Sequence, residues 1–168
     1  PGRGRRVLRQ QAPDRVRHQR AAGRRSVDRG GSLHGLAGHH PEPLNYNNIP
    51  GCTYCQPQVA SVGLTERAVK EKGIEYNVGK MPFSAVGKAI AIGETDGLVK
   101  VISDKTTGEI LGVHILHAEA TELISEAAII RSHEGITSSV LETIHPHPTL
   151  SEAIMEAMAI AEGRPINF

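Results

Sequence analysis

The chain has 168 residues, with 39% hydrophobic and 3% aromatic side chains, and its formal net charge is +1. This length allows one domain with a substantial core but not two large ones. No apolar run approaches about 18 residues and the N-terminus lacks the apolar segment of a signal peptide, so we expect no membrane span and no secretion. Two cysteines cannot form a disulfide scaffold, and the scarcity of aromatic residues argues against a nucleic-acid partner.

Charge divides the chain into two parts. Residues 1–37 hold ten of the 19 Lys and Arg residues and only two acids, whereas residues 38–168 hold nine Lys and Arg against 16 acids. Residues 1–36 show no helical or strand periodicity and few large apolar side chains, so we expect a disordered arm. A basic tail for polyanions is one interpretation. We favour out-of-frame translation of a GC-rich gene, or a cloning artefact, and expect the folded domain at 37–168.

The elements expected in the first half of that domain are short. Turn-forming and apolar-alternating stretches follow one another there, with Thr65 as a helix cap and Gly73 as its stop. In chain order we expect an extended loop at 38–52, a buried strand at 58–63, a helix at 65–72, a half-buried strand at 74–81 and a short strand at 89–92.

The second half begins with the clearest local unit, two β-rich runs that flank Asp104–Gly108 and predict an antiparallel hairpin. Helical spacing then predicts a helix at 118–132 ended by Gly135, a short helix capped by Thr137, and a final helix at 150–162. Strands first and helices later indicate an α+β fold, an antiparallel sheet covered by helices. The sequence has no Gly-rich phosphate loop and so no visible means of holding a nucleotide by itself.

Cys52 and Cys55 have the C-x-x-C spacing of dithiol oxidoreductases. Those motifs begin a helix, whereas Gly and Pro residues on both sides place this pair in a loop. A zinc site needs four ligands, and only His39 and His40 lie nearby in sequence. Redox activity and metal binding remain alternatives. We favour two small, half-buried side chains without a chemical role, and predict no metal site.

The stretch HPHPTLSEAIMEA, residues 145–157, places two His-Pro pairs directly before a helix. A cis bond before Pro148 would turn the chain sharply and fix His147 on a rigid corner. Thr149 and Glu152 fit a capping box, which is a purely structural role. Alternatively, Glu152 reaches back to His147, holds one ring nitrogen protonated and leaves the other as a base. Spacing alone leaves both interpretations open.

A family resemblance is carried by three segments, NYNNIPGCTYCQPQVASVGLTE, DKTTGEILGVHILHAEATELISEAAI and HPHPTLSEAIMEA. In these segments and their order, the chain from about Ala37 to Phe168 resembles the C-terminal interface domain of the dihydrolipoamide dehydrogenases, which are flavoprotein disulfide reductases. The resemblance implies an α+β fold of the FAD/NAD-linked reductase dimerisation-domain type. It also implies that FAD, NAD and the redox disulfide are carried mainly by domains absent from this chain.

The resemblance further implies a site shared between two subunits. By the motif, His147 corresponds to the catalytic base, Glu152 to its orienting carboxylate, and His145 to the position where the backbone approaches the partner's flavin. The base would convert a dihydrolipoamide thiol into a thiolate, and electrons would pass through the disulfide to FAD and on to NAD+. The implied partners are a second copy and the lipoyl domains of 2-oxo acid dehydrogenase or glycine cleavage complexes, in the cytoplasm or a mitochondrial or plastid matrix.

Two other functions stay open. The parent enzyme could be a glutathione-type disulfide reductase, although that branch resembles HPTSSE rather than HPHPTLSE. The chain by itself could act only as a homodimerising module, and we expect it to be inactive and free of flavin without the missing domains. In either case a dimerisation surface should expose apolar side chains. The candidates are Ile144, Leu150, Ile154, Met155 and Met158.

Overall fold

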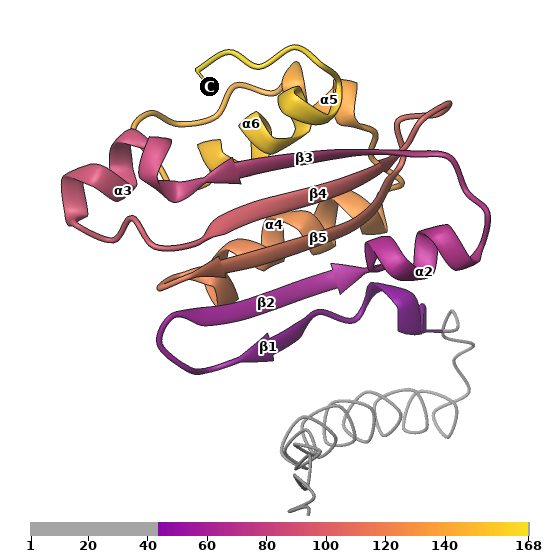
Figure 1. The fold of residues 1–168 in the computed structure, drawn as a ribbon, viewed down its shortest axis with the longest axis horizontal. Helices are drawn as coiled ribbons and strands as arrows, with labels where there is room; N and C mark the ends of the chain where they lie inside the picture. The colour runs from indigo at the N-terminus through magenta and orange to yellow at the C-terminus, as the bar shows by residue number, and fades with distance from the viewer. Residues whose placement is uncertain (1–43, 168) are drawn as a thin grey trace, which may run out of the picture. The chain divides into compact units, whose positions relative to one another are not determined.

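The structure is a computed structural model that describes residues 44–167. The expected arm at 1–36 and the expected boundary at Ala37 lie outside the described residues. Five strands form one antiparallel sheet in the order β1-β2-β5-β4-β3 (Figure 1). Their bounds are β1 Gly51–Thr53, β2 Gln58–Gly63, β3 Tyr76–Pro82, β4 Leu98–Asp104 and β5 Ile110–His117.

Helices cover one face of this sheet. α4 lies against β2 and β5, and α6 lies against β3 and β4 (Figure 1). The expected α+β fold, an antiparallel sheet covered by helices, is therefore confirmed. The helices are α2 Glu66–Glu71, α3 Gly87–Ile92, α4 Ala120–Ser132, α5 Thr137–Leu141 and α6 Glu152–Ala161, with 3-10 turns η1 Tyr46–Asn48 and η2 Phe83–Ala85.

The main core lies between the sheet and α4 and α6. Cross-strand partners such as Val101 and Val113 point to the same side because side chains alternate along each strand, and both are fully buried. Ile124 of α4 and Ile154 of α6 belong to the same cluster. None of the helices in the described part of the chain combines the length and the apolar character needed to cross a membrane.

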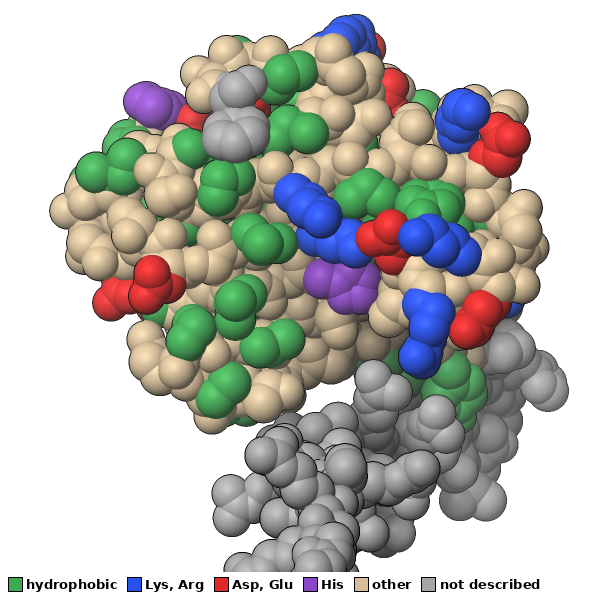
Figure 2. All heavy atoms as spheres, in the orientation of Figure 1, with side chains coloured by type: hydrophobic (Ala, Val, Ile, Leu, Met, Phe, Trp, Pro, Cys, Tyr) green, Lys and Arg blue, Asp and Glu red, His purple; other side chains and the backbone are tan. Residues whose placement is uncertain are grey.

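The opposite face of the sheet is only partly covered. Val69 of α2 forms a small second core with Ile102 and Leu111. Beside it, Glu66 contacts Lys100, Lys70 and Tyr76, and these contacts, that of Lys100 most, lower the pKa of its carboxyl to about 2. Figure 2 shows hydrophobic side chains gathered over one half of this face and charged side chains over the other half.

Several local expectations are confirmed. The Thr65 side chain accepts a hydrogen bond from the Ala68 backbone N–H and caps α2. Asp104 accepts from the backbone N–H groups of Thr106 and Thr107 in the turn between β4 and β5. Gly108 closes that turn with a φ of +75°, a left-handed conformation that favours glycine.

The expected strand at 89–92 is wrong, because Gly87–Ile92 forms helix α3. A run of four apolar residues cannot distinguish a strand from a helix by periodicity alone. Backbone hydrogen bonds distinguish them here, since the Ile90 N–H donates to the Val86 carbonyl four residues earlier, as in a helix. Gly93 ends the helix in the left-handed conformation.

Two further expectations about local roles are corrected. Cys52 lies in strand β1, where it pairs with Ala60, rather than in a loop. Thr137 is the first residue of α5 and not its cap, and its hydroxyl donates to Glu162 at the end of α6 at 2.6 Å. Pairing with the adjacent strand determines the position of Cys52, and a contact with a residue 25 positions away determines that of Thr137.

Two candidates for an exposed dimerisation surface are also wrong. Ile154 and Met158 are fully buried on the side of α6 that faces the sheet. Apolar spacing on a helix marks the face that is buried, and here the domain's own sheet covers it. Leu150 and Met155 are partly buried, whereas Ile144 is 95% exposed.

Close contact between α6 and β3 fixes the position of this last helix. Gly79 of β3 lies directly under α6, and a Cβ at this position would overlap the backbone carbonyl oxygen of Ala157. A backbone atom cannot turn aside as a flexible side chain can. The absence of a side chain at Gly79 therefore allows α6 to approach the sheet as closely as it does.

We predict that Gly79→Ala destabilises the domain, because α6 must move away from β3. Overpacking of this kind costs about 1–3 kcal/mol or more. Urea unfolding of the variant measures the change. Gly87→Ala is the matched control, since a Cβ there meets nothing within 4 Å. Equal stability of the two variants would contradict this account of α6.

Candidate functional site

The stretch at 145–157 forms a tight turn that leads into α6. The peptide bond between His147 and Pro148 is cis, and the chain reverses there. His147 Nδ1 lies 2.8 Å from Glu152 Oε1, so the structure brings together the two side chains that the sequence singled out. The His147 side chain is 79% exposed, whereas that of Glu152 is 24% exposed.

The protonation pattern of the pair follows from its hydrogen bond. A carboxylate can only accept, so His147 Nδ1 carries the hydrogen that is donated to Glu152. In the neutral ring the other nitrogen, Nε2, then has a free lone pair. Because the side chain is largely exposed, this lone pair is available to accept a proton from another molecule.

Glu152 also takes part in the start of the helix. Its second oxygen, Oε2, accepts from the Thr149 backbone N–H at 2.8 Å, which is one half of a capping box. The Thr149 hydroxyl donates instead to the Pro146 carbonyl at 2.8 Å, and the other half is not formed. The two interpretations of Glu152 are thus compatible, because one carboxylate performs both tasks with different oxygens.

The environment of Glu152 favours its charged form. Partial burial is the largest single effect and raises the pKa of the carboxyl. The hydrogen bonds from the Thr149 N–H and from His147, together with the positive charges of His147 and His145, act in the opposite direction and outweigh it. The net result is a pKa below the ordinary value of 4.5. Glu152 is therefore a carboxylate at neutral pH.

His145 lies on the inner side of the same turn. Its side chain is 8% exposed, its Nε2 lies 3.1 Å from Glu126 Oε1, and its Nδ1 lies 3.0 Å from the Thr143 carbonyl oxygen. The imidazole thus faces α4, whereas the side chain of His147 on the same turn is exposed.

The cysteine pair does not resemble a reactive dithiol. Cys52 lies in β1 and packs against the core, while Cys55 is exposed in the turn between β1 and β2. Burial, followed by the negative charge of Glu122, raises the pKa of the Cys52 thiol. A raised pKa disfavours the thiolate that redox chemistry and metal binding both require. Among the described residues, no group of three or more His, Cys, Asp or Glu side chains could hold a metal ion.

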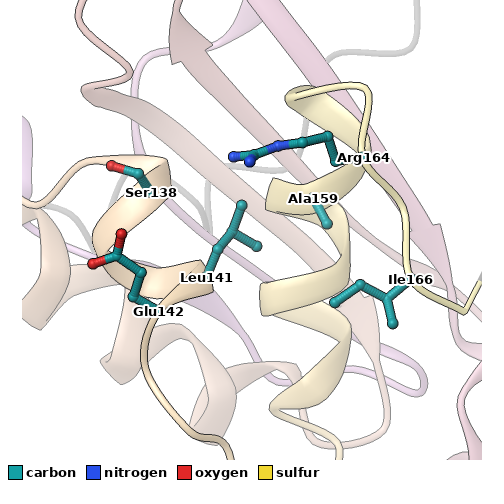
Figure 3. Close-up of a pocket in the computed structure, with 6 residues that line it drawn as sticks. All are labelled: Ser138, Leu141, Glu142, Ala159, Arg164 and Ile166. Atoms are coloured by element: carbon teal, nitrogen blue, oxygen red, sulfur yellow. The ribbon is translucent and has the colours of Figure 1, made fainter.

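A shallow groove of about 320 Å³ lies between α5, α6 and the C-terminal segment (Figure 3). It contains none of the residues of the turn at 145–149. Its lining residues are Ser138, Leu141, Glu142, Ala159, Arg164 and Ile166. None of these lining residues is a glycine, so within residues 44–167 this groove offers no Gly-rich loop of the kind that holds a dinucleotide pyrophosphate.

One residue of the site was missed by sequence reasoning. Glu126 lies 19 positions before His145, and no helical or turn spacing links the two. On α4 it follows Glu122 by one turn and reads as an ordinary acidic residue on a helix surface. Only the packing of α4 against the sheet brings it to the turn, so no local signal in the sequence could have identified it.

This fold is shared with flavoprotein disulfide reductases. The structure matches LpdA from Mycobacterium tuberculosis with a TM-score of 0.72 at 20% sequence identity, covering 77% of this chain and 28% of that one. At this identity the likeness concerns the fold alone. Sequence similarity identifies the family.

The chain belongs to the family of pyridine nucleotide-disulphide oxidoreductase dimerisation domains, whose profile matches residues 49–158. It is 50% identical over 129 residues to dihydrolipoyl dehydrogenase from Zymomonas mobilis and 48% identical over 133 residues to that from Bacillus subtilis. These matches cover 77% and 79% of this chain. The chain spans about 28% of the length of these curated relatives. The family expected from the three sequence segments is confirmed.

We predict that the Glu152 carboxyl titrates below 4.5, and that His147→Gln moves its pKa upward while the Thr149 contribution remains. A carboxyl whose pKa is lowered by folding stabilises the folded state at every pH above its unfolded-state pKa. That stabilisation is lost as the pH falls through the lower, folded-state pKa. Carboxyl ¹³C chemical shifts followed by NMR from pH 2 to 7 measure both effects. An unchanged Glu152 titration in the variant would mean that the pair does not form in solution.

Proposed function

We propose that this chain is the dimerisation domain of a dihydrolipoyl dehydrogenase and that it supplies the His147–Glu152 pair as the proton acceptor for oxidation of dihydrolipoamide. The observation that carries the proposal is the 2.8 Å hydrogen bond between the two side chains on an exposed turn. The dihydrolipoyl dehydrogenases at 48–50% identity support the choice of substrate class.

In the proposed reaction, His147 Nε2 accepts the proton of a substrate thiol. A thiol of pKa about 8.5 is mostly protonated at neutral pH, whereas the thiolate is the species that attacks a disulfide. Glu152 keeps the imidazole in the orientation that exposes Nε2 and stabilises the positive charge that the ring gains. These two residues accept and stabilise the proton, and nothing more is assigned to them.

The disulfide that accepts the thiolate, and the FAD and NAD that the family uses, belong to domains outside this chain. In the proposed reaction, the residues of this chain therefore contribute proton transfer alone. His145 is proposed to contribute its backbone near the partner subunit's flavin. Lipoyl domains of 2-oxo acid dehydrogenase or glycine cleavage complexes are the proposed source of the dithiol.

The domain family implies a homodimer, and the exposure of His147 is consistent with a site shared between two copies. An exposed base can act in catalysis only if a substrate and an electron acceptor are brought next to it, and a second subunit could provide the acceptor. We propose that the surface around the turn, with Ile144 at its most exposed point, is buried against the second copy.

A chimaera tests the catalytic proposal. Residues 44–168 replace the corresponding segment of the Zymomonas mobilis relative, and NAD+-dependent oxidation of dihydrolipoamide is measured. We expect His147→Gln to lower turnover on the order of 10²–10⁴-fold, the typical contribution of a general base. His133→Gln is the control, because that exposed histidine contacts only a carbonyl of its own helix. Full activity of the His147 variant would refute the proposed base.

Self-association of the 168-residue chain tests the proposed surface. Ile144→Asp would place a charge in the interface, and burial of an unpaired charge is costly. We expect the dimer dissociation constant to rise about tenfold or more, which corresponds to about 1.4 kcal/mol. Sedimentation equilibrium measures it. Ile90→Asp is the control, an exposed isoleucine on α3. The same effect at both positions, or at neither, would place the interface elsewhere.

A further inference from the structure

The turn that carries His147 is mostly solvent-exposed, yet it must hold an imidazole in one orientation. Ile144, Pro146, His147 and Pro148 are all exposed. Of the two histidine side chains, only that of His145 is buried, and it points back into the domain. The anchoring of this turn therefore depends on what His145 contacts.

Both ring nitrogens of His145 face hydrogen-bond acceptors. Nε2 lies 3.1 Å from a carboxylate oxygen of Glu126, and Nδ1 lies 3.0 Å from the Thr143 carbonyl oxygen. A neutral imidazole has one N–H and can satisfy only one of them, whereas the imidazolium satisfies both. The carboxylate of Glu126 supplies the negative charge that this form needs in a site that is 8% exposed.

Glu126 reaches the turn from another element. It lies on α4, which packs against β2 and β5, whereas the turn leads into α6, which packs against β3 and β4. The Glu126–His145 ion pair thus ties the turn to the second covering helix. The remaining side-chain hydrogen bonds of residues 145–149 are local. His145 Nδ1 meets the Thr143 carbonyl, the Thr149 hydroxyl donates to the Pro146 carbonyl, and His147 Nδ1 and the Thr149 N–H donate to Glu152.

The inner pair, Glu126 and His145, also affects the pKa of Glu152 in the outer pair with His147. The positive charge of His145 is one of the influences that keep the Glu152 carboxyl ionised, alongside those of His147 and the Thr149 N–H.

We infer that Glu126 is a positioning residue for the proposed base: its carboxylate anchors His145, and with it the turn that holds His147 against Glu152. The carboxylate of Glu126 contacts the imidazole of His145, whereas the imidazole of His147 contacts Glu152. Its effect on catalysis rests on the proposed function, whereas its effect on the order of the turn does not. The two consequences can therefore be tested separately.

The first test uses the 168-residue chain and NMR relaxation. In the unaltered chain we expect order parameters near 0.85 for the turn at 144–149, and in Glu126→Gln we expect them to fall toward about 0.6 or below. Gln preserves the size of the side chain but removes the charge, so the charge-assisted hydrogen bond to His145 is replaced by a weaker neutral one. Glu126→Ala should give a larger loss of order.

Glu122→Gln is the matched control, since it removes the same charge one turn earlier on α4. It should leave the turn ordered. The dispersion of the amide spectrum shows whether each variant is folded. If Glu126→Ala does not fold, the order parameters of Glu126→Gln decide the test. A turn that is equally ordered with and without the Glu126 carboxylate would overturn the inference.

The second test uses the chimaera. Because Glu126 does not contact substrate, Glu126→Gln should lower kcat about 10–100-fold, the scale of a misplaced catalytic group, with KM unchanged. Loss of activity in His147→Gln but not in Glu126→Gln would overturn the inference and leave the proposed base intact. If His147→Gln is fully active, the proposed function fails, and the NMR test alone decides the role of Glu126.

Discussion

The close approach of α6 to strand β3 is the constraint on which the rest of this structure depends. Gly79 presents no side chain, so the backbone of α6 at Ala157 lies directly on the sheet. This contact sets the height and direction of the helix, and the first turn of the helix carries Glu152. A carboxylate on a rigid, buried helix then defines where the preceding turn must place His147 to meet it.

The site combines a fixed carboxylate with an exposed imidazole, and it contains two histidine–glutamate pairs. Glu152 and His147 form the outer pair, in which one ring nitrogen is free. Glu126 and His145 form the inner pair, in which both nitrogens of the ring are engaged. The sequence repeats the dipeptide His-Pro, but the structure gives the two histidines opposite tasks because one faces solvent and the other faces α4.

Local signals predicted much of the fold. The hairpin around Asp104–Gly108 and the Thr65 cap depend on neighbouring residues, and both formed as expected. The expected strand at 89–92 failed because a four-residue apolar run fits either periodicity, and the segment forms helix α3. Ile154 and Met158 failed as surface residues because the sequence shows that a face is apolar but not what covers it. The sequence could not identify Glu126, whose partner is 19 residues away.

The sequence by itself determined the family and the α+β class, and its motif singled out His147 and Glu152, although their spacing left the contact between them open. Only the tertiary structure decided which apolar residues form the core, which histidine is buried, and which helix anchors the turn. Those features depend on contacts between segments far apart in the chain. Such contacts are set by how the sheet and its covering helices pack, and no local pattern encodes them.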